Sequence, residues 1–323
     1  MELVAIDIGG TNARFAMASV DANGGIALGE PVVLESKAHA SFETAWAHFC
    51  EIHGGTLPPF AALALAGPVE RDEITFASIP HWRIARDGLE TRMGMERISL
   101  INDFGAMGHA VARSGPEHFR HLAGPEVDLP ARGTLSVVGP GTGLGVAHVW
   151  RDGAGFYHVQ STEGGHIDFA PIDAVDDAIL ARLRARHRRV SVERVVAGPA
   201  IVDIYETLAG LEGRAIVPVK DSEVWKLAEG GGDALAVAAA ERFCLSLGSA
   251  AGDYALAQGA CGVVIAGGVA QRQAERLCRS AFAQRFTAKG RFESLMATIP
   301  VKLITHPHPG LLGAAAAFLK DMQ

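Results

Sequence analysis

The strongest constraint on the fold is a pattern that occurs twice: an apolar strand, a short glycine-rich turn and a second strand. The first copy spans residues 3–20 and turns at Gly9-Gly10, and the second spans residues 135–149 and turns at 139–145. No short-period repeat accompanies the two copies, which argues against a solenoid. We therefore predict an α/β chain of two lobes that share a duplicated β-sheet core, with a central cleft.

Strand and helix patterns alternate along the rest of the chain. Ser41 is placed to cap a helix that ends at His53. A final helix after Pro309-Gly310 is expected to pack back on the first lobe. This assigns residues 1–110 plus 310–323 to a small lobe and 111–309 to a large lobe. The other predicted elements are strands at 60–66, 98–101, 262–266 and 301–305 and helices at 107–112, 173–186, 200–208, 233–258 and 270–286.

Composition excludes several classes of protein. The 323 residues are 49% hydrophobic and 20% charged, which is typical of a globular chain with a sizeable core. The formal charge of −7 disfavours binding to nucleic acid. No basic segment followed by an apolar one opens the chain, and no uninterrupted apolar run approaches membrane-spanning length, so we expect neither secretion nor membrane insertion. Four widely spaced cysteines and the absence of a His-Glu-x-x-His motif argue against a zinc site.

The first glycine turn has the features of a phosphate-binding loop. Gly9 and Gly10 let the backbone approach an anion closely, and successive N–H groups in such a turn form a concave donor surface. Thr11 and Asn12 follow them, and Asp7 at the strand end could hold Mg²⁺ through water. A glycine pair alone would favour an ordinary hairpin turn.

The second turn is richer in glycine than a hairpin needs. Gly141, Thr142 and Gly143 supply its backbone and hydroxyl donors, and we expect the two turns to grip a triphosphate from both sides. Neither turn is a Walker A loop or a dinucleotide fingerprint. A third glycine pair, Gly267-Gly268, follows a short apolar strand.

These three segments resemble the two phosphate segments and the adenosine segment of the actin, Hsp70 and hexokinase superfamily, and within it the match to bacterial glucokinases is close. The motifs that resemble glucokinase signatures, in order along nearly the whole chain, are Asp7–Arg14, Ile101–Phe104, Gly139–Val149, Glu163–Ala170, Ser191–Pro199 and His308–Gly313. No Cys-rich zinc segment, as is common in the related ROK family, follows His166.

The resemblance implies a two-lobed actin/hexokinase-like, ribonuclease H-like fold. It also implies a cytoplasmic, homodimeric enzyme of glycolysis that uses ATP and Mg²⁺ to phosphorylate glucose. Asp103 would be the general base, with Asn102 orienting a sugar hydroxyl. The further residues that it assigns are Gly143, Glu163, His166 and Glu193 to the sugar, and Asp7, Gly9, Gly10, Thr11, Asn12, Gly141, Thr142, Gly143, Gly267 and Gly268 to the nucleotide.

Other interpretations remain open at this point. From the residues alone, Asn102-Asp103 would be a helix cap, Glu193 a first-turn helix acid and His166 a loop histidine. The substrate could instead be another hexose, such as fructose or mannose, and a sugar-responsive regulator or an ATPase scaffold shares the same fold. One residue departs from the family pattern: Ile79 stands where glucokinases generally have asparagine, although Trp82 is retained.

Overall fold

The computed structural model describes residues 1–76, 78–215 and 218–322, and the chain divides into two compact units. Unit 1 comprises Met1–Gly115, Val159–Ser161 and His306–Gln323, and unit 2 comprises Pro116–His158 and Thr162–Thr305. The lobe boundaries predicted from sequence lie a few residues from these limits. The short segment Val159–Ser161 of unit 1 has no counterpart in that prediction.

A six-stranded sheet forms the centre of unit 1. Its strands are β1 (Glu2–Ile8), β2 (Asn12–Val20), β3 (Ile26–Leu28), β4 (Val32–Glu35), β5 (Phe60–Leu65) and β8 (Arg97–Asn102). The spatial order is β3-β2-β1-β5-β8, with β4 also paired to β2. β1 pairs with β2 antiparallel, whereas β1, β5 and β8 run parallel. Two short strands, β6 (Glu73–Thr75) and β7 (Arg83–Ala85), form a separate small sheet.

Helices cover both faces of this sheet, which explains why Leu3, Val4, Ala5 and Ile6 of β1 are all fully buried. On one face, an aromatic core that includes Phe15 packs beneath α1 (Phe42–His53) and α2 (Leu89–Met93). The predicted cap of α1 is confirmed, because the Ser41 side chain accepts from the Thr44 N–H and Thr44 bonds back to Ser41.

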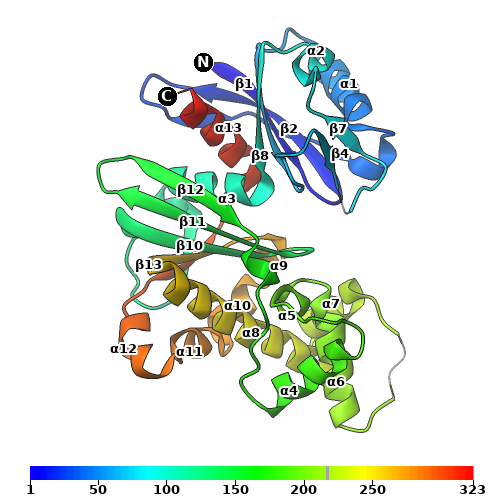
Figure 1. Cartoon of the computed structure of the whole chain (residues 1–323), viewed down its shortest axis with the longest axis vertical. Coiled ribbons are helices and arrows are strands. Elements are labelled where there is room, and N and C mark those ends of the chain that lie inside the picture. The colour runs from blue at the N-terminus through cyan, green and yellow to red at the C-terminus, as the bar shows by residue number, and fades with distance from the viewer. Residues whose placement is uncertain (77, 216–217, 323) are drawn as a thin grey trace. The chain divides into compact units, whose positions relative to one another are not determined.

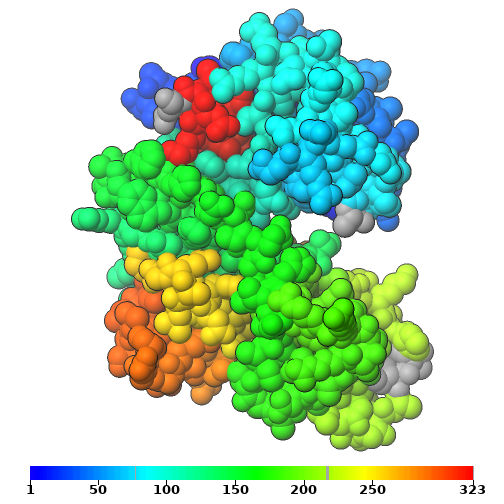
Figure 2. Space-filling model, viewed as in Figure 1, coloured from blue at the N-terminus to red at the C-terminus, as the bar shows by residue number. Residues whose placement is uncertain are grey.

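The opposite face of the sheet holds α3 (Asp103–Arg113) and the C-terminal helix α13 (Pro309–Asp321). α13 begins with proline in its first turn and packs on β1, β5 and α3, as predicted. Figure 1 shows it in red beside α3, and in Figure 2 its surface lies among the blue and cyan residues of unit 1.

A second six-stranded sheet forms the centre of unit 2, apart from Val159–Ser161 of its edge strand, which belong to unit 1. Its strands are β9 (Phe119–Ala123), β10 (Arg132–Pro140), β11 (Leu144–Asp152), β12 (Tyr157–Thr162), β13 (Ala260–Ile265) and β14 (Val301–Ile304), in the order β12-β11-β10-β13-β14-β9. β10 pairs with β11 antiparallel, and β10, β13 and β14 run parallel. This pairing repeats that of β1, β2, β5 and β8, so the predicted duplication of the core is confirmed.

The core helix of unit 2 is α8 (Ala234–Gln258), capped by Asp233. It packs against α6 (Ala200–Leu211) and α7 (Asp221–Gly230), and α4 (Ala174–Arg184) and α5 (Glu193–Val196) also pack against α6. By length and composition α8 is apolar enough to cross a membrane, although Glu241 and Arg242 interrupt its apolar sequence. In the structure 61% of its most apolar window is buried, as for a core helix.

One predicted helix, 270–286, is instead three short ones: α9 (Gly268–Arg272), α10 (Ala274–Arg279) and α11 (Phe282–Thr287), followed by α12 (Glu293–Met296). The first break is at Gln273, whose side chain bonds Glu229 of α7. The second is at Ser280, whose hydroxyl accepts from the Phe282 N–H. Each piece buries its own apolar residues, so the apolar periodicity continues across both breaks.

Candidate functional site

The first glycine turn lies in unit 1 between β1 and β2. The Gly9 N–H donates to the Asn12 carbonyl at 3.0 Å, and the Thr11 carbonyl accepts from the Ser36 N–H at 2.9 Å. A methyl group on Gly10 would lie 2.9 Å from the Ser78 side chain, so Ser78 or the turn would have to shift to accommodate it. The turn is therefore held at a fixed conformation by its own backbone and its neighbours.

Asp7 lies at the end of β1 and is mostly enclosed, with its side chain 19% exposed. Arg14, opposite it on β2, approaches its carboxylate at 3.4 Å. Burial raises the pKa of Asp7 above its usual value, while the positive charge of Arg14 and the neighbouring His308 oppose that rise. A methyl group on Gly310, in the first turn of α13, would lie 2.6 Å from the carboxylate. The start of α13 thus rests directly on Asp7, a contact that motif matching alone did not reveal.

The β8–α3 junction presents Asn102 and Asp103. The Asn102 side-chain oxygen accepts from the Phe104 N–H at 3.0 Å and the Gly105 N–H at 3.2 Å, so Asn102 is a true helix cap. Asp103 is the first residue of α3, and one of its oxygens accepts from the Phe104 N–H at 2.8 Å. Capping uses the Asn102 oxygen and leaves its amide NH₂ group as a donor, so a structural role and a ligand-binding role are compatible in this pair.

The second glycine turn lies in unit 2 between β10 and β11, and Glu193 reaches it from α5. The Glu193 carboxylate accepts from the Leu144 N–H at 2.9 Å, and a methyl group on Gly143 would lie 2.5 Å from it. The Gly141 carbonyl accepts from the Gly198 N–H at 2.8 Å. The structure therefore brings Glu193 directly against the turn, and the first-turn position that the residues alone indicated for Glu193 is also correct.

Glu163 precedes a 3₁₀ turn, Gly164–His166, that follows β12, and His166 is the last residue of that turn. The side chain of Glu163 is 89% exposed, and its carboxylate lies 3.8 Å from the His166 ring. Gly165 packs against the Leu144 carbonyl too closely for any side chain. Both polar side chains are thus accessible on a turn whose backbone is packed onto β11.

The third glycine pair connects β13 to α9. Gly267 has φ = +85°, which favours glycine, and a methyl group on it would lie 2.5 Å from the Pro140 carbonyl. Because β10 and β13 are parallel neighbours, Gly267-Gly268 lies beside the second glycine turn. The predicted residues thus form one set in unit 1, at the carboxyl ends of β1 and β8, and another set in unit 2.

Metal ligands are sparse in this arrangement. Among residues 1–76, 78–215 and 218–322, no group of three or more His, Cys, Asp or Glu side chains is placed to hold a metal. A Mg²⁺ ion on a nucleotide takes most of its ligands from phosphate and water and needs only one or two carboxylates. Asp7 fits that limited role, because it is an enclosed carboxylate at the glycine turn.

Ile79 has a structural role. Its side chain is 1% exposed and belongs to the aromatic core of unit 1 with the fully buried Trp82. The Trp82 ring N–H donates to the His39 carbonyl at 3.0 Å. Ile79 is therefore a packing residue of this core.

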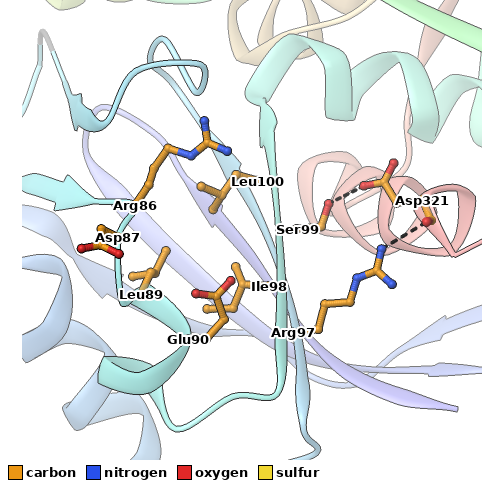
Figure 3. Close-up of a pocket in the computed structure, with 9 residues that line it drawn as sticks. All are labelled: Arg86, Asp87, Leu89, Glu90, Arg97, Ile98, Ser99, Leu100 and Asp321. Carbon is orange, nitrogen blue, oxygen red and sulfur yellow. Dashed lines mark hydrogen bonds between the residues drawn. The ribbon is translucent and has the colours of Figure 1, made fainter.

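A pocket of about 430 Å³ in unit 1 contains none of the predicted site residues. Figure 3 shows it on α2 and the first part of β8, with Asp321 of α13 bonded to Ser99 and Arg97. Asn102 lies at the other end of β8. The pocket is therefore separate from the candidate site.

Comparison with known proteins identifies close relatives. The family model described as glucokinase matches residues 3–321. A glucokinase of Zymomonas mobilis is 52% identical over 98% of both chains. A glucokinase of Caulobacter vibrioides is 40% identical over 98% of this chain and 94% of its own length. The crystal structure of a glucokinase from an Antarctic psychrotroph superposes with a TM-score of 0.85 at 32% identity, covering 99% of both chains.

Proposed function

The chain belongs to the glucokinase family of ATP-dependent sugar kinases, and we propose that it transfers the γ-phosphate of ATP to the 6-hydroxyl of glucose with Asp103 as general base. The observation that supports this role is the β8–α3 junction. There a carboxylate and a spare amide donor stand side by side at a helix start, held by backbone hydrogen bonds.

A sugar hydroxyl is a weak nucleophile, so the reaction needs a base within hydrogen-bond reach. In the proposed step, Asp103 takes the O6 proton while O6 forms a bond to the γ-phosphorus and the bond to the β-phosphate oxygen breaks. The products are ADP and glucose 6-phosphate. The Asn102 amide donates to a neighbouring hydroxyl and thereby orients the sugar.

Backbone donors hold the nucleotide in this proposal. The N–H groups of Gly9 and Gly141 bond within their own turns, so other N–H groups of the turns Gly9–Asn12 and Gly141–Gly143 would bind the phosphate oxygens. Gly267-Gly268 would allow the adenosine to lie close to the backbone. Bound Mg²⁺ would neutralise phosphate charge, and Asp7 would hold it through water. We further propose, from the family resemblance, that the protein is a cytoplasmic homodimer. Analytical ultracentrifugation tests the dimer.

A matrix of phosphate donors and sugars tests the function. Purified protein is supplied with ATP, ADP or polyphosphate and with glucose, mannose or fructose, and nucleotide and sugar phosphate are quantified. The proposal expects ATP with glucose to give the highest kcat/KM. A higher kcat/KM with fructose or mannose would make the enzyme a kinase for that hexose, and no phosphate transfer to any sugar would refute the assignment.

Glu193→Gln is expected to raise the KM for glucose by about tenfold, because a neutral amide forms weaker hydrogen bonds with sugar hydroxyls than a carboxylate does. The glutamine oxygen can still accept from the Leu144 N–H, so the turn should persist. Glu241→Gln is the matched control, since Glu241 bonds Arg276 at 2.9 Å elsewhere in unit 2. An unchanged KM in Glu193→Gln would remove Glu193 from the sugar site.

Arg14→Gln is expected to move the acid limb of the pH–activity profile upward by about one pH unit. Burial already raises the Asp7 pKa, so Asp7 gains its proton at a higher pH than an ordinary carboxylate as the solution is acidified. Removing the Arg14 charge raises the Asp7 pKa further, so the Asp7 carboxylate that activity requires becomes protonated at a higher pH. Arg83→Gln, which breaks an exposed ion pair with Glu73, is the control. Identical acid limbs in both variants would contradict this role of Asp7.

A further inference from the structure

Tyr254 connects the core helix of unit 2 to the turn that carries Glu163 and His166. It lies on α8 with its side chain 4% exposed, and its hydroxyl donates to the Gly164 carbonyl at 2.8 Å. The same carbonyl also accepts from the Ile167 N–H at 3.1 Å, which closes the 3₁₀ turn. The hydroxyl of this buried tyrosine is thus bonded to the backbone between Glu163 and His166, two proposed sugar ligands.

The other supports of the turn come from β11 and β12. The Thr162 hydroxyl donates to the Val146 carbonyl at 3.0 Å and accepts from the Gly164 N–H at 3.2 Å. Gly165 packs on the Leu144 carbonyl. Tyr254 adds a contact from α8 to these strand contacts, so the turn is also held from a separate element.

Leu144 links this turn to Glu193. Its carbonyl supports Gly165, and its N–H donates to the Glu193 carboxylate at 2.9 Å. The charge of Glu193 also acts on Tyr254. Burial, followed by the charges of Asp253 and Glu193, raises the pKa of the Tyr254 hydroxyl well above its usual value. The hydroxyl therefore remains a proton donor over the whole range in which such an enzyme works.

From these contacts we propose that Tyr254 is a positioning residue that sets hexose selectivity by holding the Glu163–His166 turn in register with Glu193. Its buried hydroxyl bonds the turn backbone, so it acts through the turn. The inference rests on the proposed function, because it assumes that Glu163, His166 and Glu193 contact the sugar. It goes further because it proposes that Tyr254, a residue of α8 outside every sequence motif, holds these three side chains in place.

The test is Tyr254→Phe, which removes the hydroxyl and keeps the packing ring. We expect the KM for glucose to rise roughly tenfold, because one buried hydrogen bond is worth about that factor. The kcat should stay within about threefold of the wild-type value. The ratio of kcat/KM for glucose to kcat/KM for mannose or 2-deoxyglucose should decrease, because a displaced turn no longer fits the glucose hydroxyls closely. The KM for ATP should not change.

Tyr205→Phe is the matched control, because the Tyr205 hydroxyl donates to Asp233 at 2.8 Å, also in unit 2 but at the other end of α8. A purely structural loss would lower the melting temperature of both variants without changing sugar selectivity in either. If the KM and selectivity of Tyr254→Phe match those of Tyr205→Phe, the inference is overturned. If the wild-type protein itself does not phosphorylate glucose, the proposed function fails independently of Tyr254.

Discussion

Asp103→Asn is expected to lower kcat by about a thousandfold or more while the KM for glucose changes only a few-fold. The amide oxygen can still accept from the Phe104 N–H, as the carboxylate does at 2.8 Å, so α3 keeps its first turn. What is lost is the ability to take a proton from the sugar hydroxyl. Sugar-dependent ADP release measures kcat, and isothermal titration with glucose measures binding.

Asp233→Asn provides the control for a change from acid to amide at a helix start. Asp233 caps α8 through the Leu235 and Ala236 N–H groups, and an asparagine side chain can make the same bonds. We expect near wild-type kcat from this variant. A kcat for Asp103→Asn within about tenfold of wild type would rule out Asp103 as the base.

Gly313→Ala is expected to destabilise unit 1 by about 3 kcal/mol, because overpacking at a rigid contact displaces backbone rather than a side chain. Gly313 of α13 lies against the backbone carbonyl of Ala106 in α3, in a space too small for a methyl group. The methyl would force the two helices apart. Since α3 begins with Asp103, activity should fall together with stability, which urea unfolding followed by circular dichroism would measure.

Gly210→Ala is the matched control, because Gly210 lies in helix α6 with nothing within 4 Å of an added methyl group. There the same substitution should be neutral or stabilising by up to about 1 kcal/mol. Equal unfolding free energies for Gly313→Ala and Gly210→Ala would contradict the packing argument.

The fold could be predicted largely from the sequence because its main feature is a repeated local pattern. Strand, glycine turn and strand each have a sequence signal, and two copies indicate two sheets. The parallel pairing of β1 with β5 and of β5 with β8 could not be read from any single segment, since it depends on contacts between distant strands. The broken helix 270–286 was missed because apolar residues remain buried on both sides of the breaks at Gln273 and Ser280, so the hydrophobic pattern does not mark them.

The candidate site was predicted less completely than the fold. Motifs assigned roles to Asp103 and Glu193, but local pattern could not show that Glu193 folds back onto Gly143 across about fifty residues of chain. Gly310 was recognised within a motif without a role, and its contact with Asp7 required the packed structure. Tyr254 had no sequence signal, because a tyrosine in an alanine-rich helix is indistinguishable from an ordinary core residue.

The most direct test of the central claim is a crystal structure of the protein with glucose and a non-hydrolysable ATP analogue. The account predicts that a carboxylate oxygen of Asp103 lies about 2.6–3.2 Å from O6 of the sugar, as a general base requires. A glucose molecule bound in the presence of the nucleotide with O6 out of reach of Asp103 would contradict it.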